Sequence, residues 1–105
     1  MKGISFGKGS VSSELEAISD TLGATRIFLV STNSLRESPE LVTVENAIGA
    51  RIVGKSFQSV AHTPGKLVLQ IKDLVLKSGA NAILSLGGSS AIDLAKAAAL
   101  CIAEG

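Results

Sequence analysis

A glycine- and serine-rich stretch at residues 85–96, SLGGSSAIDLAK, holds the residue types of this chain that are best suited to binding chemistry. Gly87 and Gly88 would let the backbone approach a ligand closely. Ser89 and Ser90 supply hydroxyl groups that can donate hydrogen bonds. A helix is expected to begin directly after these residues, and the N-terminus of a helix carries free N–H groups and a partial positive charge. Together these features predict an anion site for a phosphate or a pyrophosphate.

The same residues also have a purely structural interpretation. Ser90 and Asp93 have the spacing of a capping box, in which a serine and an acidic residue three positions later satisfy the first N–H groups of a helix. The two glycines would then form only a tight turn between a strand and that helix. The local pattern leaves the phosphate site and the capped helix equally open.

Three other parts of the sequence contain residue types that are common in cofactor or metal sites, but without the neighbouring residues that such sites require. Residues 7–12, GKGSVS, are close to the G-x-G-x-x-G fingerprint of dinucleotide-binding proteins, but residues 31–33 lack the acidic residue that this fingerprint requires. His62 is the only histidine, and without nearby carboxylates or cysteines it does not make a metal site. Cys101 is the only cysteine, which excludes an internal disulfide and predicts a small buried residue.

The composition argues against several classes of partner. The chain is 46% hydrophobic and 18% charged, as expected for a soluble globular protein. A net charge of +1 and the absence of Trp and Tyr favour neither nucleic acid nor an anionic membrane as a partner. No apolar run approaches the roughly 18 residues of a membrane span, and the first residues, MKGISFGKGSV, lack the apolar run expected of a signal peptide. We therefore expect a cytoplasmic protein.

Short apolar segments alternate with helical patterns along the chain. The segments rich in Ile, Leu and Val predict strands at residues 4–6, 26–32, 50–56 and 81–87. This alternation predicts parallel strands joined by right-handed crossovers, and therefore an α/β fold with a doubly wound, mostly parallel, Rossmann-like sheet. Ligands bind such sheets at the carboxyl ends of the strands. Three loops are expected there, at residues 31–39, 56–64 and 87–90.

Capping signals define the helices between these strands. Ser13, the Ser38–Pro39 pair and the Thr63–Pro64 pair are expected to begin helices. Glycines that end helices are expected at Gly23, Gly49 and Gly79. The apolar faces expected to point inward comprise Leu15, Ile18 and Leu22, then Leu41, Val44 and Ile48, then Leu67, Ile71 and Leu74 with Val68 and Val75 beside them.

The segment NAILSLGGSSAIDLAKAAAL resembles the nucleotide-binding segment of the iron-containing (group III) alcohol dehydrogenase family. That family has an apolar strand, the motif G-G-G-S-x-x-D-x-A-K and an alanine-rich helix. The matching residues are Gly87, Gly88, Ser90, Asp93, Ala95 and Lys96, and Ser89 stands in place of the third glycine. Residues 4–32 and 60–88 are similar to the neighbouring parts of the family pattern, so the resemblance covers essentially the whole chain.

The resemblance implies a two-domain enzyme of which residues 1–105 are an incomplete N-terminal domain. That domain binds NAD or NADP, and a helical C-terminal domain, absent here, holds a divalent metal (Fe or Zn) through an Asp and three His. A hydride passes between the nicotinamide and a small alcohol or carbonyl substrate. We expect a homodimer, and we expect the 105 residues alone to be inactive because the catalytic and metal-binding residues lie outside them.

The resemblance also implies the cofactor contacts of this chain. The residues expected to bind the cofactor are Gly87, Gly88, Ser89, Ser90, Asp93 and Lys96 in the motif, with Thr32 and Asn33 at the end of the second strand. Asp93 would orient the loop, and Lys96 would contact a phosphate or the nicotinamide side. Thr32 stands where many NAD-preferring members carry Asp, and threonine would not repel a 2′-phosphate. We therefore expect a relaxed preference between NAD and NADP.

Three alternatives remain open from the sequence. FLVST and VAHTP are similar to the maleylacetate reductase branch of the family, whereas Asp93 follows the broader alcohol dehydrogenase pattern. A glycerol dehydrogenase-like or dehydroquinate synthase-like relative would have a similar nucleotide domain. A non-catalytic α/β module that binds a nucleotide or phosphate is the alternative from a different class.

Overall fold

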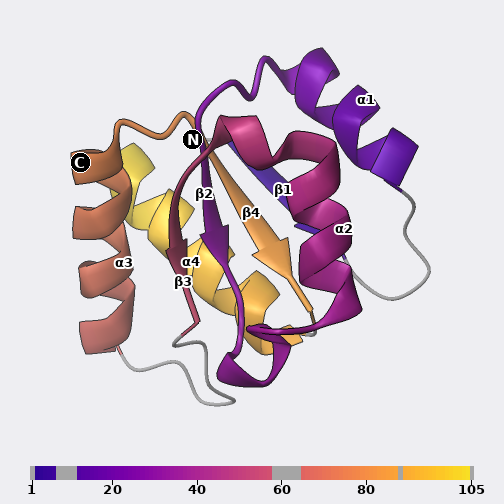
Figure 1. Cartoon of the computed structure of the whole chain (residues 1–105). Helices are drawn as coiled ribbons and strands as arrows, with labels where there is room; N and C mark the ends of the chain where they lie inside the picture. Colours follow the sequence, from indigo (N-terminus) through magenta and orange to yellow (C-terminus); the bar gives the residue numbers. More distant parts are fainter. Residues whose placement is uncertain (1, 7–11, 58–64, 88, 105) are drawn as a thin grey trace.

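The computed structural model describes residues 2–6, 12–57, 65–87 and 89–104, in which strands and helices alternate as expected (Figure 1). The strands are β1 (Lys2–Phe6), β2 (Ile27–Val30), β3 (Ile52–Ser56) and β4 (Ala82–Leu86). The α-helices are α1 (Ser12–Leu22), α2 (Pro39–Ile48), α3 (Gly65–Ser78) and α4 (Ser89–Glu104). Two short 3₁₀ turns, η1 (Asn33–Leu35) and η2 (Gly49–Arg51), lie on either side of α2. The predicted α/β class is confirmed.

All four described strands form one parallel sheet in the order β1-β4-β2-β3. Every residue of β2 and β4 is buried, which explains why both segments are apolar at nearly every position. In β3, which lies at the sheet edge, exposed and less exposed residues alternate. Ile27 pairs with Ala82, and Val30 pairs with Ser85, so the central strands β2 and β4 end at nearly the same level.

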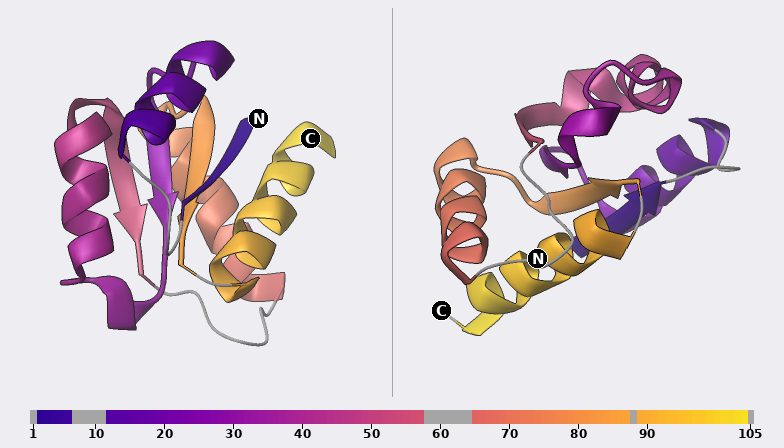
Figure 2. Two further views of the ribbon diagram at one scale, coloured as in Figure 1. Left: turned by 90° about the vertical axis from the view of Figure 1, so that its right-hand side faces the viewer. Right: turned by 90° about the horizontal axis from the view of Figure 1, so that it is seen from below.

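Helices cover both faces of this sheet (Figure 2). Leu84 and Leu86 of β4 pack with residues of α1 and α2, whereas Ile83 packs with residues of α3 and α4. This alternation follows from the side-chain period of two along a strand. Full burial of a Leu or Ile side chain contributes about 1.5–3 kcal/mol, so the two cores hold the sheet in place from both sides.

The helix starts are confirmed in one place and corrected in two. The Ser38 hydroxyl accepts a hydrogen bond from the Leu41 N–H at 3.2 Å, and Pro39 is the first residue of α2. Ser13 and Ser90 each lie one residue inside a helix, so the prediction that they act as N-caps is wrong. Each helix begins at the preceding serine, so the N-cap positions are residues 11 and 88, which lie outside the described residues.

Two of the three glycines predicted to end helices have a left-handed conformation. Gly23 and Gly79 have φ values of 67° and 75°, in the left-handed region that ends a helix. Gly49 is the C-cap of α2, as predicted, but its φ of −55° lies in the right-handed helical region and the chain continues into η2. The chain there leaves the helix through a 3₁₀ turn, which needs no left-handed residue.

Two residues assigned to inward faces point outward instead. Ile18 and Leu74 are each 44% exposed. Their neighbours Ser19 and Val75 are fully buried and occupy the inward positions. Ser19 satisfies its hydroxyl by donating to the Leu15 carbonyl at 2.8 Å, so a small polar residue is tolerated where α1 packs closely.

Candidate functional site

The loops after β2 and β4 leave neighbouring strands in opposite directions. The loop after β2 leads to α2 on one face of the sheet, and the loop after β4 leads to α4 on the other face. Such a topological switch point, at the carboxyl ends of the strands, is where open parallel sheets bind ligands. We call this end of the sheet the carboxyl edge. Its loops contain Thr32, Asn33 and Gly87, three of the residues predicted to bind the cofactor.

Gly87 turns the chain away from β4 in a conformation that other residues rarely adopt. Its φ is 115°, and a Cβ at this position would lie 2.6 Å from Leu35 Cδ1. Glycine is therefore required both for the backbone conformation and for the contact with Leu35 of η1. Gly87 has a conformation suited to a tight turn after β4, and Leu35 in the loop after β2 lies against it.

Ser31 connects the ends of three strands beneath the loops of the carboxyl edge. Its hydroxyl donates to the Leu86 carbonyl at 2.8 Å, and its backbone N–H donates to the Ser56 carbonyl at 2.8 Å. Ser31 is fully buried, so these bonds tie the ends of β2, β3 and β4 together away from water. The role of Ser31 was not predicted from the sequence. A serine directly after a fully apolar strand is the signal that would have indicated it.

The residues that follow form a small polar cluster. The hydroxyl groups of Thr32 and Ser34 share a hydrogen bond of 2.9 Å. Arg36 Nε donates to Asn33 Oδ1 at 3.2 Å, and Arg36 Cζ lies 4.9 Å from the centroid of the Phe57 ring. Asn33 therefore holds Arg36, which was not predicted as a site residue from the sequence. An arginine shortly after the second strand is a signal that was available in the sequence.

The remaining motif residues lie on α4. Ser90 is partly exposed, and Asp93 and Lys96 are exposed. Within the described ranges the ion pairs are Arg51 with Asp20 and Lys55 with Glu45, so Asp93 and Lys96 are not paired with each other.

Lys96 and Ser85 line a hollow of about 440 Å³ between β1, β4 and α4. This hollow lies on the β1 side of β4, whereas Thr32 follows β2 on the other side. Thr32 and Asn33 therefore belong to the loop whose Leu35 lies against Gly87, whereas Lys96 lines a separate hollow.

Several predicted features lie outside the described residues. They are Gly88, the side chain of Ser89, the Thr63–Pro64 helix start, His62 and most of the GKGSVS segment. Cys101 is described and is only partly buried, so the prediction of a buried residue is wrong. It lies on α4 near the C-terminal end of the helix.

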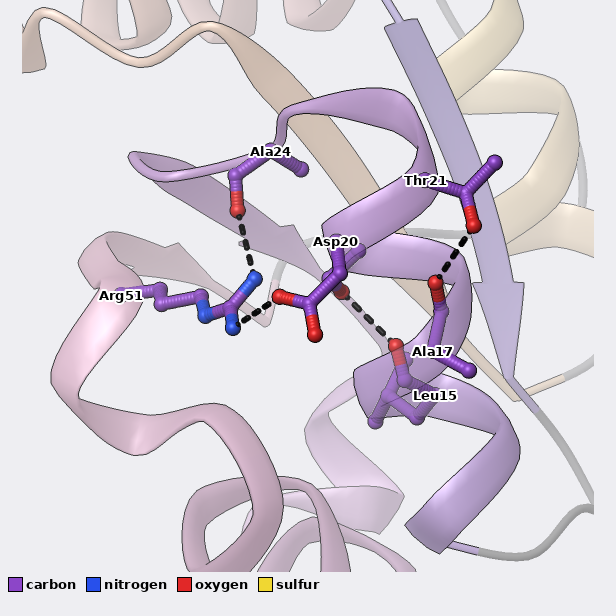
Figure 3. A network of polar contacts seen from close by, with 7 residues as sticks. Leu15, Ala17, Asp20, Thr21, Ala24 and Arg51 are labelled. Carbon is purple, nitrogen blue, oxygen red and sulfur yellow. Dashed lines mark hydrogen bonds and ion pairs between the residues drawn. The ribbon is translucent and has the colours of Figure 1, made fainter.

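The opposite end of the sheet, where the strands begin, carries a different set of polar contacts. Arg51 Nη2 and Asp20 Oδ1 form an ion pair at 2.5 Å, and Arg51 Nη1 donates to the Ala24 carbonyl at 3.3 Å (Figure 3). Asn81 accepts from the Arg26 N–H at 3.1 Å and donates to the Gly23 carbonyl at 3.2 Å. These contacts join α1, η2 and the starts of β2, β3 and β4. We call this end of the sheet the amino edge.

The residues present do not fit the divalent metal that the resemblance implies. Across residues 2–6, 12–57, 65–87 and 89–104, no three His, Cys, Asp or Glu side chains are grouped so that they could hold a metal ion. In the same ranges no helix has both the length and the apolar character needed to cross a membrane. The Gly87 turn, by contrast, has the strand–turn–helix geometry on which a phosphate group can be bound.

The fold and the switch point define an α/β protein of the doubly wound, Rossmann-like class. The family model for iron-containing alcohol dehydrogenase matches residues 2–105, and the chain belongs to this family. The resemblance seen in the sequence is thereby confirmed.

Curated relatives and a solved structure agree with this assignment. The chain is 33% identical over 81 residues to Dehydrogenase ALT3 of Alternaria alternata, covering 76% of this chain and 21% of the relative. It is 30% identical over 95 residues to the maleylacetate reductase of Burkholderia cepacia, covering 90% and 26%. The crystal structure of maleylacetate reductase from Agrobacterium tumefaciens is 25% identical with a TM-score of 0.76, covering 96% and 29%. The chain thus spans about a quarter of the length of these relatives.

Proposed function

We propose that this chain is the nicotinamide dinucleotide-binding portion of a metal-dependent dehydrogenase or carbonyl reductase. The observation that carries the proposal is the Gly87 turn at the switch point, in a chain whose family and curated relatives are oxidoreductases. When bound, the nicotinamide would supply the chemistry of hydride transfer to a carbonyl or from an alcohol. The proposed substrates are small alcohols or carbonyl compounds, in keeping with the names of the relatives.

Each part of the carboxyl edge has a role in this proposal. The first turn of α4, with Ser90, offers N–H groups and a hydroxyl to the pyrophosphate, because a helix N-terminus favours negative charge. Thr32 and Asn33 lie at the end of β2, where a bound ribose would be recognised. Lys96 would add a positive charge on the β1 side of β4, beside the hollow. Asp93, on the first turns of α4, would orient the loop.

The metal has no place among the described residues, so the proposal assigns metal binding and catalysis to a domain outside this chain. The chain on its own is therefore proposed to bind the cofactor without turning it over. We further propose a cytoplasmic location and a homodimeric assembly for the full enzyme, as the resemblance and the composition suggest.

Calorimetric titration of residues 1–105 with NAD⁺, NADP⁺ and adenosine tests the proposal. We expect both dinucleotides to bind and adenosine, which lacks phosphate, to bind at least about tenfold more weakly, because charge-assisted hydrogen bonds to phosphate contribute strongly. Oxidation of NADH or NADPH with ferrous or zinc ion and a small aldehyde is expected to stay at the buffer rate. Failure of both dinucleotides to bind would refute the binding role, and metal-dependent turnover would refute the assignment of catalysis to another domain.

A further inference from the structure

Arg36 is the described cation whose surroundings best suit recognition of a second phosphate group. Its Nε donates to Asn33 Oδ1 at 3.2 Å, and its guanidinium stacks 4.9 Å from the centroid of the Phe57 ring. The hydrogen bond to Asn33 holds one edge of the planar guanidinium, and the Phe57 ring packs against one of its faces. An arginine fixed in this way loses less conformational freedom when it binds an anion than a free side chain would.

The charge of Arg36 is not neutralised within the described part of the chain. The acidic residues in ion pairs there are Asp20 and Glu45, which pair with Arg51 and Lys55. Arg36 is exposed, and its single hydrogen bond to a neutral amide leaves both terminal Nη groups without a described partner. The two Nη groups can donate two parallel hydrogen bonds to the oxygens of one phosphate group.

The position of Arg36 after the second strand indicates which part of a dinucleotide it would contact. It ends the η1 turn, four residues after Thr32, and its neighbour Leu35 packs against Gly87. In doubly wound sheets the group that discriminates NAD from NADP stands after the second strand, as an acid for the 2′-hydroxyl or an arginine for the 2′-phosphate. Here the residues directly after β2 are Ser31, Thr32 and Asn33, so no acid stands at this point.

We infer that Arg36 binds the 2′-phosphate of NADP and gives this chain a preference for NADP over NAD. The inference rests on the proposed dinucleotide-binding function and goes beyond it. Thr32 alone predicts only that the 2′-phosphate is not repelled, and hence no preference. Arg36, held by Asn33 and Phe57, adds an attraction that only the phosphorylated cofactor receives.

The test compares binding of NADP⁺ and NAD⁺ to residues 1–105 and to three variants by calorimetry. We expect the wild-type chain to bind NADP⁺ at least about tenfold more tightly than NAD⁺, the gain typical of a charge-assisted hydrogen bond. Arg36→Gln is expected to remove this advantage and to leave the NAD⁺ affinity within about twofold. Arg36→Lys keeps the charge but loses the planar fork, so it is expected to retain only part of the advantage.

Lys77→Gln is the matched control, because it removes the same charge from an exposed position in the last turn of α3. It is expected to leave the ratio of the two affinities unchanged. Adenosine 2′-monophosphate should compete with NADP⁺ on the wild-type chain at least about tenfold better than on Arg36→Gln, and raising the salt to 0.5 M should reduce the difference. Circular dichroism confirms that each variant is folded.

The outcomes separate this inference from the proposed function. If the wild-type chain binds both dinucleotides and Arg36→Gln changes neither affinity, or changes both equally, the inference is wrong and the proposed function stands. If the wild-type chain binds neither dinucleotide, both are wrong. A wild-type preference for NAD⁺ would also refute the inference.

Discussion

The amino and carboxyl edges of the sheet use their polar residues in different ways. At the amino edge, Asn81 and Arg26 form hydrogen bonds to residues 53–58 positions away in the sequence. At the surface of the carboxyl edge, Thr32 bonds to Ser34 and Asn33 bonds to Arg36, two and three positions away. The exception is Ser31, whose bond to Leu86 spans 55 positions but is buried below the surface.

This difference indicates that the polar residues of the amino edge serve mainly stability, whereas those of the carboxyl edge serve mainly binding. Long-range hydrogen bonds at the amino edge join elements that are far apart in the chain, and breaking them costs folding free energy. The local bonds at the carboxyl edge shape a loop and leave hydroxyl and guanidinium donors available for a ligand. This agrees with the general rule that parallel α/β sheets place their binding residues at the carboxyl ends of the strands. The following variants should therefore act on stability at one edge and on binding at the other.

Gly87→Ala should have the largest effect, and it should affect both stability and binding. The new Cβ would meet Leu35 Cδ1 at 2.6 Å in a backbone with φ of 115°. Overpacking and an unfavourable φ together cost about 2–4 kcal/mol. Urea unfolding should show this loss, and dinucleotide binding should weaken at least about tenfold because the turn must rearrange.

Gly79→Ala is the matched control at the amino edge. Gly79 also has a positive φ, 75°, but no atom lies within 4 Å of an added Cβ. Only the conformational cost of about 1–2 kcal/mol is expected, with dinucleotide affinity unchanged. Equal losses of stability in Gly87→Ala and Gly79→Ala would show that the contact with Leu35 does not contribute to the cost of the substitution. Weaker dinucleotide binding in Gly79→Ala would show that the two edges do not differ in their effect on binding.

Asn81→Ala should lower stability without changing binding. Asn81 accepts from the Arg26 N–H and donates to the Gly23 carbonyl and the Thr25 hydroxyl. Loss of these partly exposed bonds should lower the free energy of unfolding by about 1–2 kcal/mol. Asn81→Asp keeps the acceptor and should lose less. A change of more than about threefold in dinucleotide affinity would mean that the two edges are coupled.

Most of the fold could be predicted because it depends on patterns that are local in the sequence. The apolar runs of β2 and β4 indicated strands buried on both faces, and both lie in the centre of the sheet. Ile18 and Leu74 were wrongly predicted to face inward, whereas the prediction for Val75, beside Leu74, is confirmed. Helical periodicity gives the direction of a face only approximately, and packing against neighbouring helices decides which residue is covered.

The candidate site was predicted less completely. Gly87 was recognisable because a tight turn after an apolar strand requires glycine. Ser31 and Arg36 were not predicted because their roles depend on Leu86 and Phe57, which lie 55 and 21 positions away, although the position of each residue after the second strand was visible in the sequence. The proposed contacts of Ser90, Asp93 and Lys96 with a cofactor remain predictions.

Ser38→Ala should have a moderate effect that is confined to stability. The Ser38 hydroxyl accepts from the Leu41 N–H at the start of α2 and donates to the Leu35 carbonyl at 2.8 Å. Loss of a helix N-cap costs about 1 kcal/mol, and Ser38→Asp should restore part of it. Because Leu35 packs against Gly87, a loss of binding larger than about threefold would show that the cap also positions the carboxyl edge.

The smallest effect is expected for Asp20→Asn, in the ion pair of Figure 3. The Asp20 side chain is 62% exposed, and an exposed ion pair contributes about 0.2–1 kcal/mol. Arg51 keeps its hydrogen bond to the Ala24 carbonyl, so the loss should lie near the lower end and should vanish at high salt. Glu45→Gln, which breaks the exposed pair with Lys55 on β3, is the matched control and should lose as little. A loss above about 1 kcal/mol in Asp20→Asn alone, measured by urea unfolding, would show that the amino edge also depends on charge and not only on the hydrogen bonds of Asn81 and Arg26.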